Sequence, residues 1–480
     1  MAFPAVPPRE PRTTTPTQHV VHRSLSGDAY TSLRQRATPR EERHALGKSM
    51  RHQVPRSSLA LWSASARITD PIDLVIGSHR GRRPELIPLR VERMLASPYG
   101  FLRGAAIVMA ADFATLPATG ITPVICGDSH VGNFGFYASP ERDLVIDLND
   151  FDEAHPGSWE WDLRRLTASI WVAGRENGFS EDDCETAVRS CVEAYREQVR
   201  ELAEQPLMSR SFQRVDVDSL RESTTDVALH KGIDRAAKKA RRSTSDRALP
   251  RFSTEEGGRR RIVEEPPLIA HLPGEEYDAV ASGLDEYLGT LSSHWRRVLG
   301  GYTLIDLAQK VVGVGSVGLR AYVALCEGSS PDDVIFLQLK QARRSVVAPF
   351  MHGDSAWHDH QGQRVVEYQQ ALQTVSDPLL GWTTIDGRQF YVRQFRNMKG
   401  SLPLDSIGAP AMTDYVRVCG RLLAKGHART SGASMIAGYA GTSDRMDGAL
   451  ARFASLYADQ TEADHAAFTR SVNAGRLPHA

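Results

Sequence analysis

The chain has 480 residues, of which 41% are hydrophobic and 24% are charged, the proportions of a globular protein with room for more than one domain. Lysine plus arginine and aspartate plus glutamate balance at 58 each, so the overall charge indicates neither nucleic acid nor an anionic membrane as a partner. The sequence contains no long apolar run or N-terminal signal pattern, and its cysteines lack CxxC spacing. We therefore expect a reduced, cytoplasmic protein without membrane contact.

The predicted elements follow one another in five parts. In the first half, a strand in "ITPVICGD" leads to a hairpin in "FGFYASPERDLVIDLND", and long helices follow. In the second half, strands around "VVGVGSVGLRAYVAL" enclose one helix, and helices return from "MTDYVRVCGRLLAKGHART" onwards. We predict a disordered arm (1–45), a part containing the hairpin and helices (46–205), a basic insertion (206–265), a strand-rich lobe (266–400) and C-terminal helices (401–480).

The stretch "CGDSHVGNFG" places Asp128 five residues before Asn133. Kinase catalytic loops, H-R-D-L-x-x-x-N, have the same interval between the catalytic aspartate and an asparagine that ligates Mg²⁺. His130 lies between the two, where it would orient Asp128, contact a phosphate or pack structurally. The spacing predicts Asp128 and His130 as catalytic residues and Asn133 as a metal ligand.

The predicted hairpin ends in "DLNDFDE", which carries four acids within seven residues. Their carboxylates would repel one another unless a cation lay among them, so we expect Mg²⁺ held against the phosphates of ATP. Asp150 has the position of the kinase DFG aspartate. Because it follows Asn133 by 17 residues, a longer interval than usual, Asp147 and Asp152 stay open as alternative ligands.

The segment "VGVGSVG" has G-x-G-x-x-G spacing. A dinucleotide-binding interpretation requires a helix next, whereas the pattern here predicts a second strand, "LRAYVALCEG". A third strand then carries Lys340, and the following helix carries Glu367. This order is that of the hairpin that covers the nucleotide in protein kinases, in which the lysine pairs with the glutamate. The predicted nucleotide-binding residues are Gly313, Gly315, Ser316, Gly318, Lys340 and Glu367.

The order of these motifs is the reverse of that in kinases, because Asp128 lies far upstream of Gly313. A circular permutation restores the kinase order. In that case the helix ending "LLAKGHART" lies against "ITPVICGD" without a direct chain connection. We therefore predict a two-lobed α+β fold of the protein-kinase type, circularly permuted.

The segments "GDSHVGN" and "DFDEA…WDL" are similar to the loops of aminoglycoside-phosphotransferase-like kinases, H-G-D-x-H-x-x-N and I-D-[FW]-x-x-A…D-L. In this resemblance Asp162 braces the catalytic loop from a helix. Cys126 stands where those kinases have the loop histidine.

Six spaced segments resemble the bacterial family called domain of unknown function 2252 (DUF2252). The resemblance covers nearly the whole chain from about residue 45, and it implies kinase-like roles for Asp128, Asn133 and Lys340. Arg103 and Arg393 belong to its motifs, where they would reach phosphate or pair with the acids. The segments are "SPYGFLRGAA", "CGDSHVGNFG", "IDLNDFDEAHPGSWEWDLRRL", "VVGVGSVGLRAYVAL", "FYVRQFRNMKGS" and "LLAKGHART".

These patterns predict an ATP- and Mg²⁺-dependent phosphotransferase for a small hydroxylated molecule. One alternative is a non-catalytic, pseudokinase-like regulator that binds nucleotide. Another is a nucleic-acid-associated protein that uses the basic segment 231–261, although such runs are more often solvated helix faces, and we do not expect nucleic acid as the partner. The histidines and aspartates of "MHGDSAWHDHQG" fit a loop better than a metal site. The sequence names neither the acceptor nor the oligomeric state.

Overall fold

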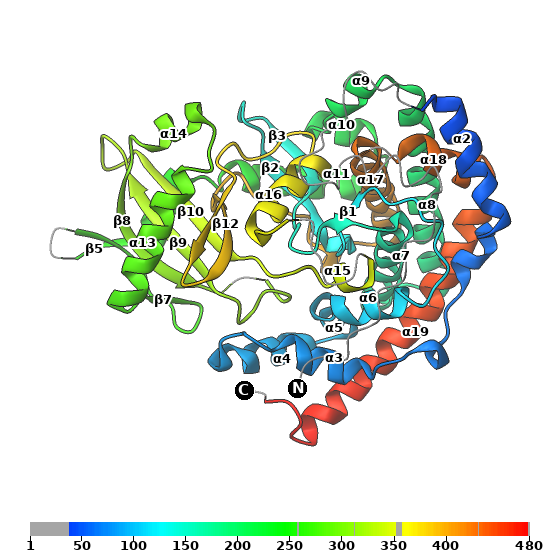
Figure 1. The fold of residues 1–480 in the computed structure, drawn as a ribbon, viewed down its shortest axis with the longest axis horizontal. Coiled ribbons are helices and arrows are strands. Elements are labelled where there is room, and N and C mark those ends of the chain that lie inside the picture. Colours follow the sequence, from blue (N-terminus) through cyan, green and yellow to red (C-terminus); the bar gives the residue numbers. More distant parts are fainter. Residues whose placement is uncertain (1–37, 257–258, 312, 352–357, 431, 479–480) are drawn as a thin grey trace.

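The computed structural model combines a helical part with a strand-rich part, which lie side by side in Figure 1. This mixed α+β architecture agrees with the predicted class. The structure describes residues 38–256, 259–311, 313–351, 358–430 and 432–478.

Short helices form the N-terminal segment of the described chain. Asp70 and Ser97 cap two of them by accepting hydrogen bonds from backbone N–H groups of the first turn. A helix begins at Arg40, inside the arm predicted over 1–45, and residues 1–37 of that arm lie outside the described residues. The helices are α2 (Arg40–Ser49), α3 (Pro71–Ser78), α4 (Ile87–Leu95), α5 (Pro98–Gly104) and α6 (Ala106–Phe113), with 3-10 helices η1 (Met50–His52), η2 (Arg56–Ala60), η3 (Ala64–Ala66) and η4 (Pro84–Leu86).

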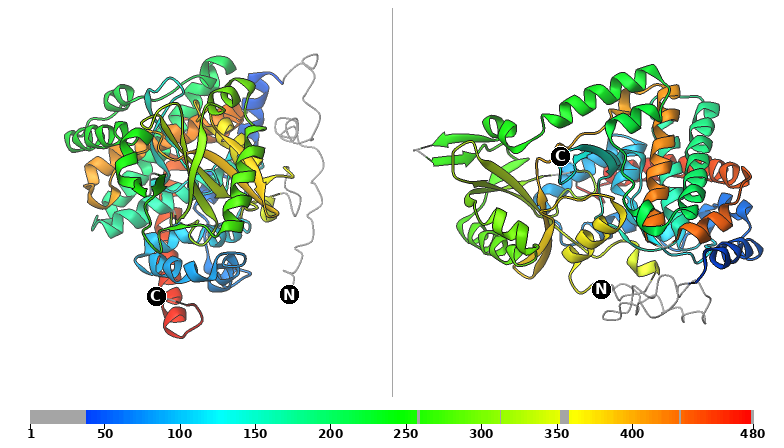
Figure 2. Two further views of the ribbon diagram at one scale, coloured as in Figure 1. Left: turned by 90° about the vertical axis from the view of Figure 1, so that its left-hand side faces the viewer. Right: turned by 90° about the horizontal axis from the view of Figure 1, so that it is seen from above.

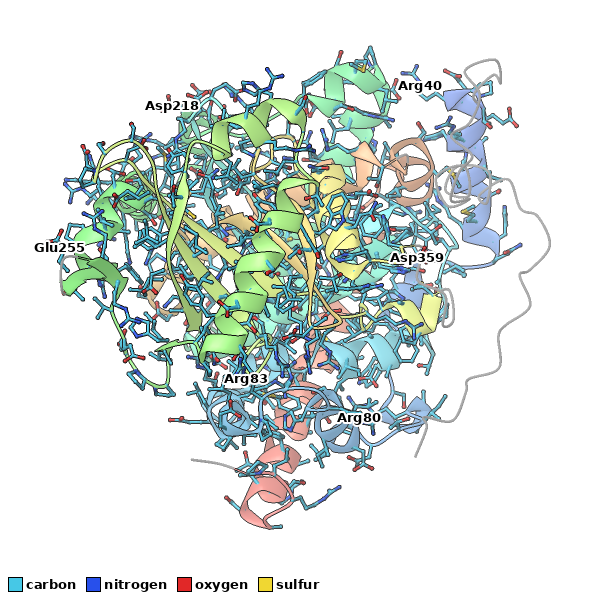
Figure 3. The ribbon with its side chains drawn as sticks, turned by 60° about the vertical axis from the view of Figure 1, so that its left-hand side comes forward. Arg40, Arg80, Arg83, Asp218, Glu255 and Asp359 are labelled. Atoms are coloured by element: carbon cyan, nitrogen blue, oxygen red, sulfur yellow. The ribbon has the colours of Figure 1, made fainter. Side chains whose placement is uncertain are left out.

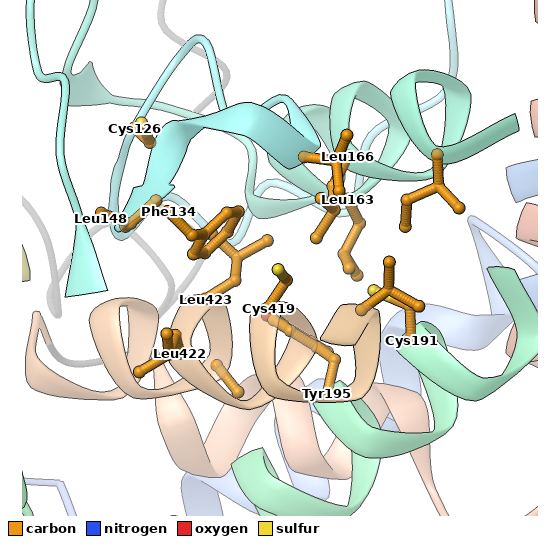
Figure 4. Close-up of a cluster of buried hydrophobic side chains, with 14 of the residues drawn as sticks. Cys126, Phe134, Leu148, Leu163, Leu166, Cys191, Tyr195, Cys419, Leu422 and Leu423 are labelled. Atoms are coloured by element: carbon orange, nitrogen blue, oxygen red, sulfur yellow. The ribbon is translucent and has the colours of Figure 1, made fainter. Parts of the chain in front are cut away.

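Five helices build the helical part around one apolar core. Two of them pack so closely that a Cβ on Gly420 would lie 2.2 Å from the carbonyl oxygen of Cys191. Figure 4 shows Leu163, Tyr195 and Leu423 among the buried side chains of this core. In the described part of the chain, no helix has the length and apolar character needed to cross a lipid bilayer. The helices are α7 (Trp159–Glu176), α8 (Glu181–Glu204), α17 (Ala409–Arg429), α18 (Ala433–Ala440) and α19 (Arg445–Asn473).

The predicted hairpin lies against this core. Its register pairs Phe134 with Leu148 and Ala138 with Leu144, and both strands are buried along their whole length. The turn between them contains Arg142 with a φ of 70°. Two shorter strands form a second antiparallel pair beside the hairpin. The elements are β1 (Val124–Ile125), η5 (Val131–Asn133), β2 (Phe134–Ala138), β3 (Leu144–Leu148) and β4 (His155–Pro156).

The strand-rich part is a six-stranded antiparallel sheet in the order β11-β12-β10-β9-β8-β7. The helix over Gly274–Leu288 covers one face of the sheet and packs Val280 and Tyr287 against Leu307 and Leu337. The helix over Gln361–Leu372 follows β10 in the chain and packs on β11 and β12. The strands are β7 (Ile269–His271), β8 (Thr303–Lys310), β9 (Ala321–Glu327), β10 (Val334–Gln341), β11 (Gly381–Ile385) and β12 (Arg388–Gln394); the helices are α13 (Gly274–Leu288), α14 (Ser293–Leu299), α15 (Ala348–Met351), α16 (Gln361–Leu372) and η6 (Leu404–Ser406).

The basic insertion connects the two parts. Its longest helix buries Leu229 and Ile233 against the hairpin and α17, and a following helix packs on β10. The hairpin at its end projects from the far side of the sheet (Figure 2, right). Lys231, Arg235 and Lys238 are exposed, so much of the basic run is a solvated helix face. The elements are α9 (Leu207–Ser211), α10 (Val217–Glu222), α11 (Val227–Arg241), α12 (Ser245–Phe252), β5 (Ser253–Glu256) and β6 (Arg259–Ile262).

Candidate functional site

The loop between β1 and β2 (residues 126–133, here the Asp128 loop) is held from below by one side chain of α7. The Asp162 carboxylate accepts hydrogen bonds from the backbone N–H groups of Cys126, at 2.7 Å, and Gly127, at 2.9 Å. Ser129 donates its hydroxyl to the Asp162 carbonyl at 2.7 Å. Asp162 is completely buried. Its predicted bracing role is therefore confirmed.

The end of α17 completes this support from a distant part of the chain. Nε2 of His427 lies 3.2 Å from the Asp162 carboxylate, and the Tyr195 hydroxyl lies 2.8 Å from Nδ1 of the same histidine. The backbone N–H of Val124 donates to Oγ1 of Thr430 at 3.1 Å. The segments "LLAKGHART" and "ITPVICGD" thus lie side by side, as predicted, although no direct chain connection joins them.

Asp128 points from its loop into a cavity, and Arg165 binds one of its two carboxylate oxygens. Nε and Nη2 of Arg165 lie 2.8 Å and 2.6 Å from Oδ1 of Asp128, and Nη2 also donates to the carbonyl of Leu102. The Asp128 side chain keeps 24% of its surface exposed. Burial raises the pKa of its carboxyl, while Arg165 opposes that rise. Oδ2 has no hydrogen-bond partner among the described residues, so it is the oxygen available to a ligand.

Asn133 joins the Asp128 loop to the acidic stretch (residues 147–153). Its amide nitrogen donates to the carbonyl oxygens of Asp128 and Asp150, each at 3.1 Å. With the amide N–H groups used in this way, the amide oxygen is the atom left for a cation. This arrangement places Asp150, with 49% of its side chain exposed, beside the loop.

Asp147 takes a different direction from its neighbours. Its carboxylate forms an ion pair with Lys425 of α17, and both side chains are almost fully buried in the helical part. It also accepts a hydrogen bond from the N–H of Leu148 at 3.0 Å. Asp147 was open as an alternative metal ligand, but this ion pair occupies it within the core. Asp150 is the acid that lies beside Asn133.

Lys340 enters the acidic stretch from β10. Its ammonium lies 2.9 Å from Oδ2 of Asp152 and 3.8 Å from Oδ1 of Asp150. The Tyr391 hydroxyl donates to the other oxygen of Asp152 at 2.8 Å, and the ammonium lies over the Tyr391 ring. Burial acts to raise the pKa of Asp152, but Lys340 and Tyr391 outweigh it and hold that pKa below its ordinary value. Lys340 therefore faces Asp150, as predicted.

The predicted ion pair between Lys340 and Glu367 is wrong. Glu367 accepts hydrogen bonds from His358, at 2.6 Å, and Gln363, at 2.8 Å. Because α16 turns Glu367 toward the loop that precedes it, the acidic stretch supplies the partner of Lys340 instead.

The histidine-rich segment does not form a metal centre in its described portion. His360 caps α16 and contacts Thr383, while His358 binds Glu367; His352 and Asp354 lie outside the described residues. Among the residues that the structure describes, no three His, Cys, Asp or Glu side chains converge to hold a metal by themselves. All five cysteines are free and buried.

The glycine-rich turn (residues 313–318) joins two strands, as the sequence predicts. Gly313 and Gly318 have φ of 40° and 86°, values that suit glycine, and β9 follows directly. The turn rests on the N-terminal helices, because Arg83 donates its backbone N–H to the carbonyl of Gly318 at 2.7 Å. The side chains of Arg82 and Arg93 also bond to carbonyls of this segment. Sequence patterns do not reveal this cover.

These elements enclose a cavity of about 230 Å³, here the central cavity. Arginines that the sequence does not single out also line it, among them Arg82, Arg90 and Arg343. Gly318, Lys340, Glu367, Asn133 and Asp147 are not part of its lining. The predicted site residues that do line it are Asp128, His130, Asp150, Gly313, Gly315 and Ser316.

His130 is a neutral part of this lining. Nδ1 accepts a hydrogen bond from the N–H of Gly132 at 3.2 Å, and the ring contacts Tyr99 edge-on. Burial, with Arg103 and Arg165 nearby, lowers its pKa well below the ordinary value. These contacts of Nδ1 and of the ring orient His130 within the Asp128 loop.

A larger hollow of about 610 Å³ lies beside α2, α8 and α18, far from these residues in the fold. Its arginines Arg51 and Arg56 donate to the carbonyls of Tyr439 and Ala440 at the end of α18. These bonds satisfy orphan carbonyls of a helix terminus and so stabilise the fold.

The model of an uncharacterised protein family conserved in bacteria matches residues 82–471. The chain belongs to the DUF2252 family. Comparison with curated proteins and with solved structures finds no match. The DUF2252 match contains every predicted site residue and begins at Arg82, in the segment that covers the glycine-rich turn. The resemblance expected from about residue 45 is thus confirmed from residue 82 onwards.

Proposed function

We propose that this DUF2252 protein is an ATP- and Mg²⁺-dependent phosphotransferase with a circularly permuted, kinase-like fold. Its acceptor is a small hydroxylated molecule. The observation that carries the proposal is that the Asp128 loop, Asp150 and the glycine-rich turn, which are remote in sequence, line one cavity. Phosphoryl transfer depends mainly on positioning and charge neutralisation, which such a set of groups can supply.

The succession of elements supports this fold assignment. Strand β8, the glycine-rich turn, β9, β10 with Lys340, helix α16 and strands β11 and β12 follow one another as in a kinase small lobe. The contact between Val124 and Thr430 lies where a continuous kinase chain would pass from its helix into the catalytic strand. A permutation explains both facts with one change of connectivity.

Asp128 acts on the acceptor in this proposal. Arg165 holds Oδ1, so Oδ2 is presented to a hydroxyl in the central cavity. The acceptor oxygen forms a bond to the terminal phosphorus of ATP while the bond from that phosphorus to ADP breaks, and the hydroxyl proton passes to Oδ2. A carboxyl whose pKa is raised by burial is better matched to this task than an exposed one.

The cation sites lie around Asp150. The amide oxygen of Asn133 and the carboxylate of Asp150 fit Mg²⁺, a hard cation that prefers oxygen ligands and needs few of them from the protein when phosphates are bound. In that position Mg²⁺ would neutralise phosphate charge. Lys340, Arg393 and Lys399 lie near Asp150. Burial, with Arg393 and Lys340 nearby, lowers the pKa of Lys399 well below its ordinary value, against the opposing effect of Asp377 and Asp150.

A thermal-shift experiment tests the nucleotide part of the proposal. We expect ATP with Mg²⁺ to raise the Tm of the wild type, and EDTA to reduce that rise. Asp150→Asn should lose the magnesium-dependent portion, whereas Asp218→Asn, on the exposed side of α10, should keep it. An unchanged magnesium response in Asp150→Asn would show that another acid, such as Asp152, holds the metal.

The transfer itself is tested by a screen of hydroxylated metabolites with release of ADP as the readout. We expect at least one class of acceptor to stimulate ADP release by the wild type but not by Asp128→Asn. ATP binding without turnover for any acceptor would contradict the enzyme proposal.

One observation favours a nucleotide-binding regulator as the second candidate. Active protein kinases require the ion pair between the strand lysine and the helix glutamate. Here Glu367 is hydrogen-bonded to His358, and Lys340 forms its ion pair with Asp152. The same ADP-release screen separates the two candidates, because a regulator binds ATP without consuming it.

A further inference from the structure

Three arginines from separate segments crowd one side of the central cavity. Arg82 follows α3, Arg90 lies on α4, and Arg343 follows β10. Nε of Arg82 and Nη1 of Arg343 both donate to the carbonyl of Ser78, at 3.1 Å and 3.3 Å. Figure 3 labels Arg80 and Arg83 on the segment that brings Arg82 to the glycine-rich turn. We call Arg82, Arg90 and Arg343 the arginine cluster.

Protein carboxylates act on the arginine cluster without forming ion pairs: Glu153 acts on Arg82 and Arg343, and Asp152 acts on Arg82. Arg90 is 1% exposed and donates from Nη2 to the carbonyl of Gly104, but its Nε and Nη1 have no hydrogen-bond partner in the part of the chain that the structure describes. Among the described residues, no Asp or Glu forms an ion pair with any member of the cluster. Burial and the nearby Arg343 together lower the pKa of Arg82 to about 10, although Glu153 and Asp152 oppose this. Buried charges of one sign are costly unless a counter-ion is present.

Glu153 is the acid of the acidic stretch whose charge acts on both Arg82 and Arg343. Its carboxylate already accepts a hydrogen bond from the N–H of Val346 at 2.6 Å. Burial raises the pKa of Glu153 to about 7, so near neutral pH it carries only part of a negative charge. The cluster therefore keeps an excess of positive charge beside Asp128.

In other parts of this protein, carboxylates compensate the charge of arginines that are largely buried. Arg67 binds Asp112 and Asp464, and Arg196 binds Asp447 with two hydrogen bonds. Arg164, whose guanidinium nitrogens have no hydrogen-bond partner among the described residues, lies over the Phe453 ring in the helical core and lines neither hollow. The arginine cluster differs from all of these because its members line an open cavity and have no ion-pair partner among the described residues.

We infer that the arginine cluster is a binding site for an oxyanion of the phosphate type. Planar guanidinium groups match phosphate oxygens in a fork geometry, and a bound oxyanion would supply the missing hydrogen-bond partners of Arg90. The anion is either the terminal phosphate of the donor or a phosphate already carried by the acceptor. The choice between these two sources rests on the proposed function, whereas the oxyanion site itself does not.

The first experiment uses inorganic phosphate and pyrophosphate as probes in calorimetric titrations of the full chain. We expect saturable binding to the wild type, weakened at least about 10-fold in Arg90→Gln and in Arg343→Gln. Arg343 is less buried than Arg90, so the second variant keeps the test decisive if the first fails to fold. Arg388→Gln, which changes an exposed arginine at the start of β12, is the matched control and should bind as the wild type does.

Two results would overturn the site: no binding of either probe to the wild type, or equal binding by Arg343→Gln and the wild type. The second experiment locates the source. If the cluster holds the donor's terminal phosphate, Arg343→Gln weakens ATP binding but leaves ADP binding unchanged. If it holds an acceptor's phosphate, ATP affinity is unchanged and phosphate binds together with ATP. Phosphate binding in a protein that does not bind ATP would retain the oxyanion site and remove the proposed function.

Discussion

Two lysine–aspartate pairs draw on the same acidic stretch and serve two regions of the molecule. The lysine is 5% exposed in both, yet its partner is 3% exposed in the Lys425–Asp147 pair and 26% exposed in the Lys340–Asp152 pair. The first pair lies in the helical core, and the second lies at the border of the two parts next to the half-exposed Asp150. The comparison shows that the surroundings of the carboxylate, rather than those of the lysine, distinguish a pair that stabilises the fold from one within reach of a ligand.

The largest expected effect is on the core pair. Lys425→Met leaves Asp147 buried without a cation, so the free energy of unfolding should fall by about 3–5 kcal/mol. Chemical denaturation measures this loss. The double variant Asp147→Leu with Lys425→Met should recover most of it, because it removes both buried charges. A loss below about 1 kcal/mol in the single variant would place this pair with the exposed kind.

The next effect concerns the chemistry at the central cavity. Asp128→Asn should lower turnover by about 10²-fold or more, the range for losing a general base, while ATP affinity stays nearly intact. ADP release and ATP titration measure the two quantities, with Asp218→Asn as the control for charge. If both variants turn over as the wild type does, the acid that matters lies elsewhere.

Glu153 extends the comparison, because this acid lines the central cavity and forms no ion pair with a lysine among the described residues. Its pKa is raised from 4.5 to about 7, so the folded state holds the proton more tightly than the unfolded state does. Stability should therefore fall as pH rises from about 4.5 through 7. We expect Glu153→Gln to gain about 2 kcal/mol relative to the wild type between pH 5 and pH 8, after allowance for partial exposure. Denaturation at the two pH values checks this, and a gap that does not change with pH would contradict it.

The smallest effect on stability is expected for the Lys340–Asp152 pair. Lys340→Met should weaken ATP binding about 10-fold and lower the free energy of unfolding by less than about 1 kcal/mol, because Asp152 keeps the Tyr391 hydrogen bond and contact with water. Calorimetric titration and denaturation give the two values. A stability loss as large as that of Lys425→Met, without loss of ATP affinity, would make both pairs structural.

Local patterns predict the elements that carry these residues. Alternation and turn residues indicate the hairpin, and the strand after the glycine-rich turn excludes a dinucleotide-binding interpretation. The burial of Asp147 also has a local signal, since it lies inside the apolar strand "LVIDL", whereas Asp150 and Asp152 follow the strand end. That signal favours Asp150 over Asp147 as the ligand.

Partners from distant segments were beyond such patterns. Lys340 meets Asp152 across 188 residues, and nothing in either segment distinguishes that contact from one with Glu367, which lies on the next helix. The arginine cluster assembles from three segments without a shared motif. Its charge becomes informative only when the contacts show that no described carboxylate forms an ion pair with it.

The contact between the end of α17 and strand β1 has a consequence for biosynthesis. During translation the Asp128 loop and Asp162 leave the ribosome early, but Thr430, Lys425 and His427 follow some 300 residues later, since the Val124–Thr430 contact alone spans 306 positions. Until then, Asp147 lacks its ion-pair partner Lys425, and Asp162, which supports the Asp128 loop, lacks its contact with His427. Contacts of such sequence separation form slowly, and a nascent chain that awaits them exposes apolar surface. Chains truncated before α17 should therefore depend on chaperones or be degraded, even though they contain the entire acidic stretch.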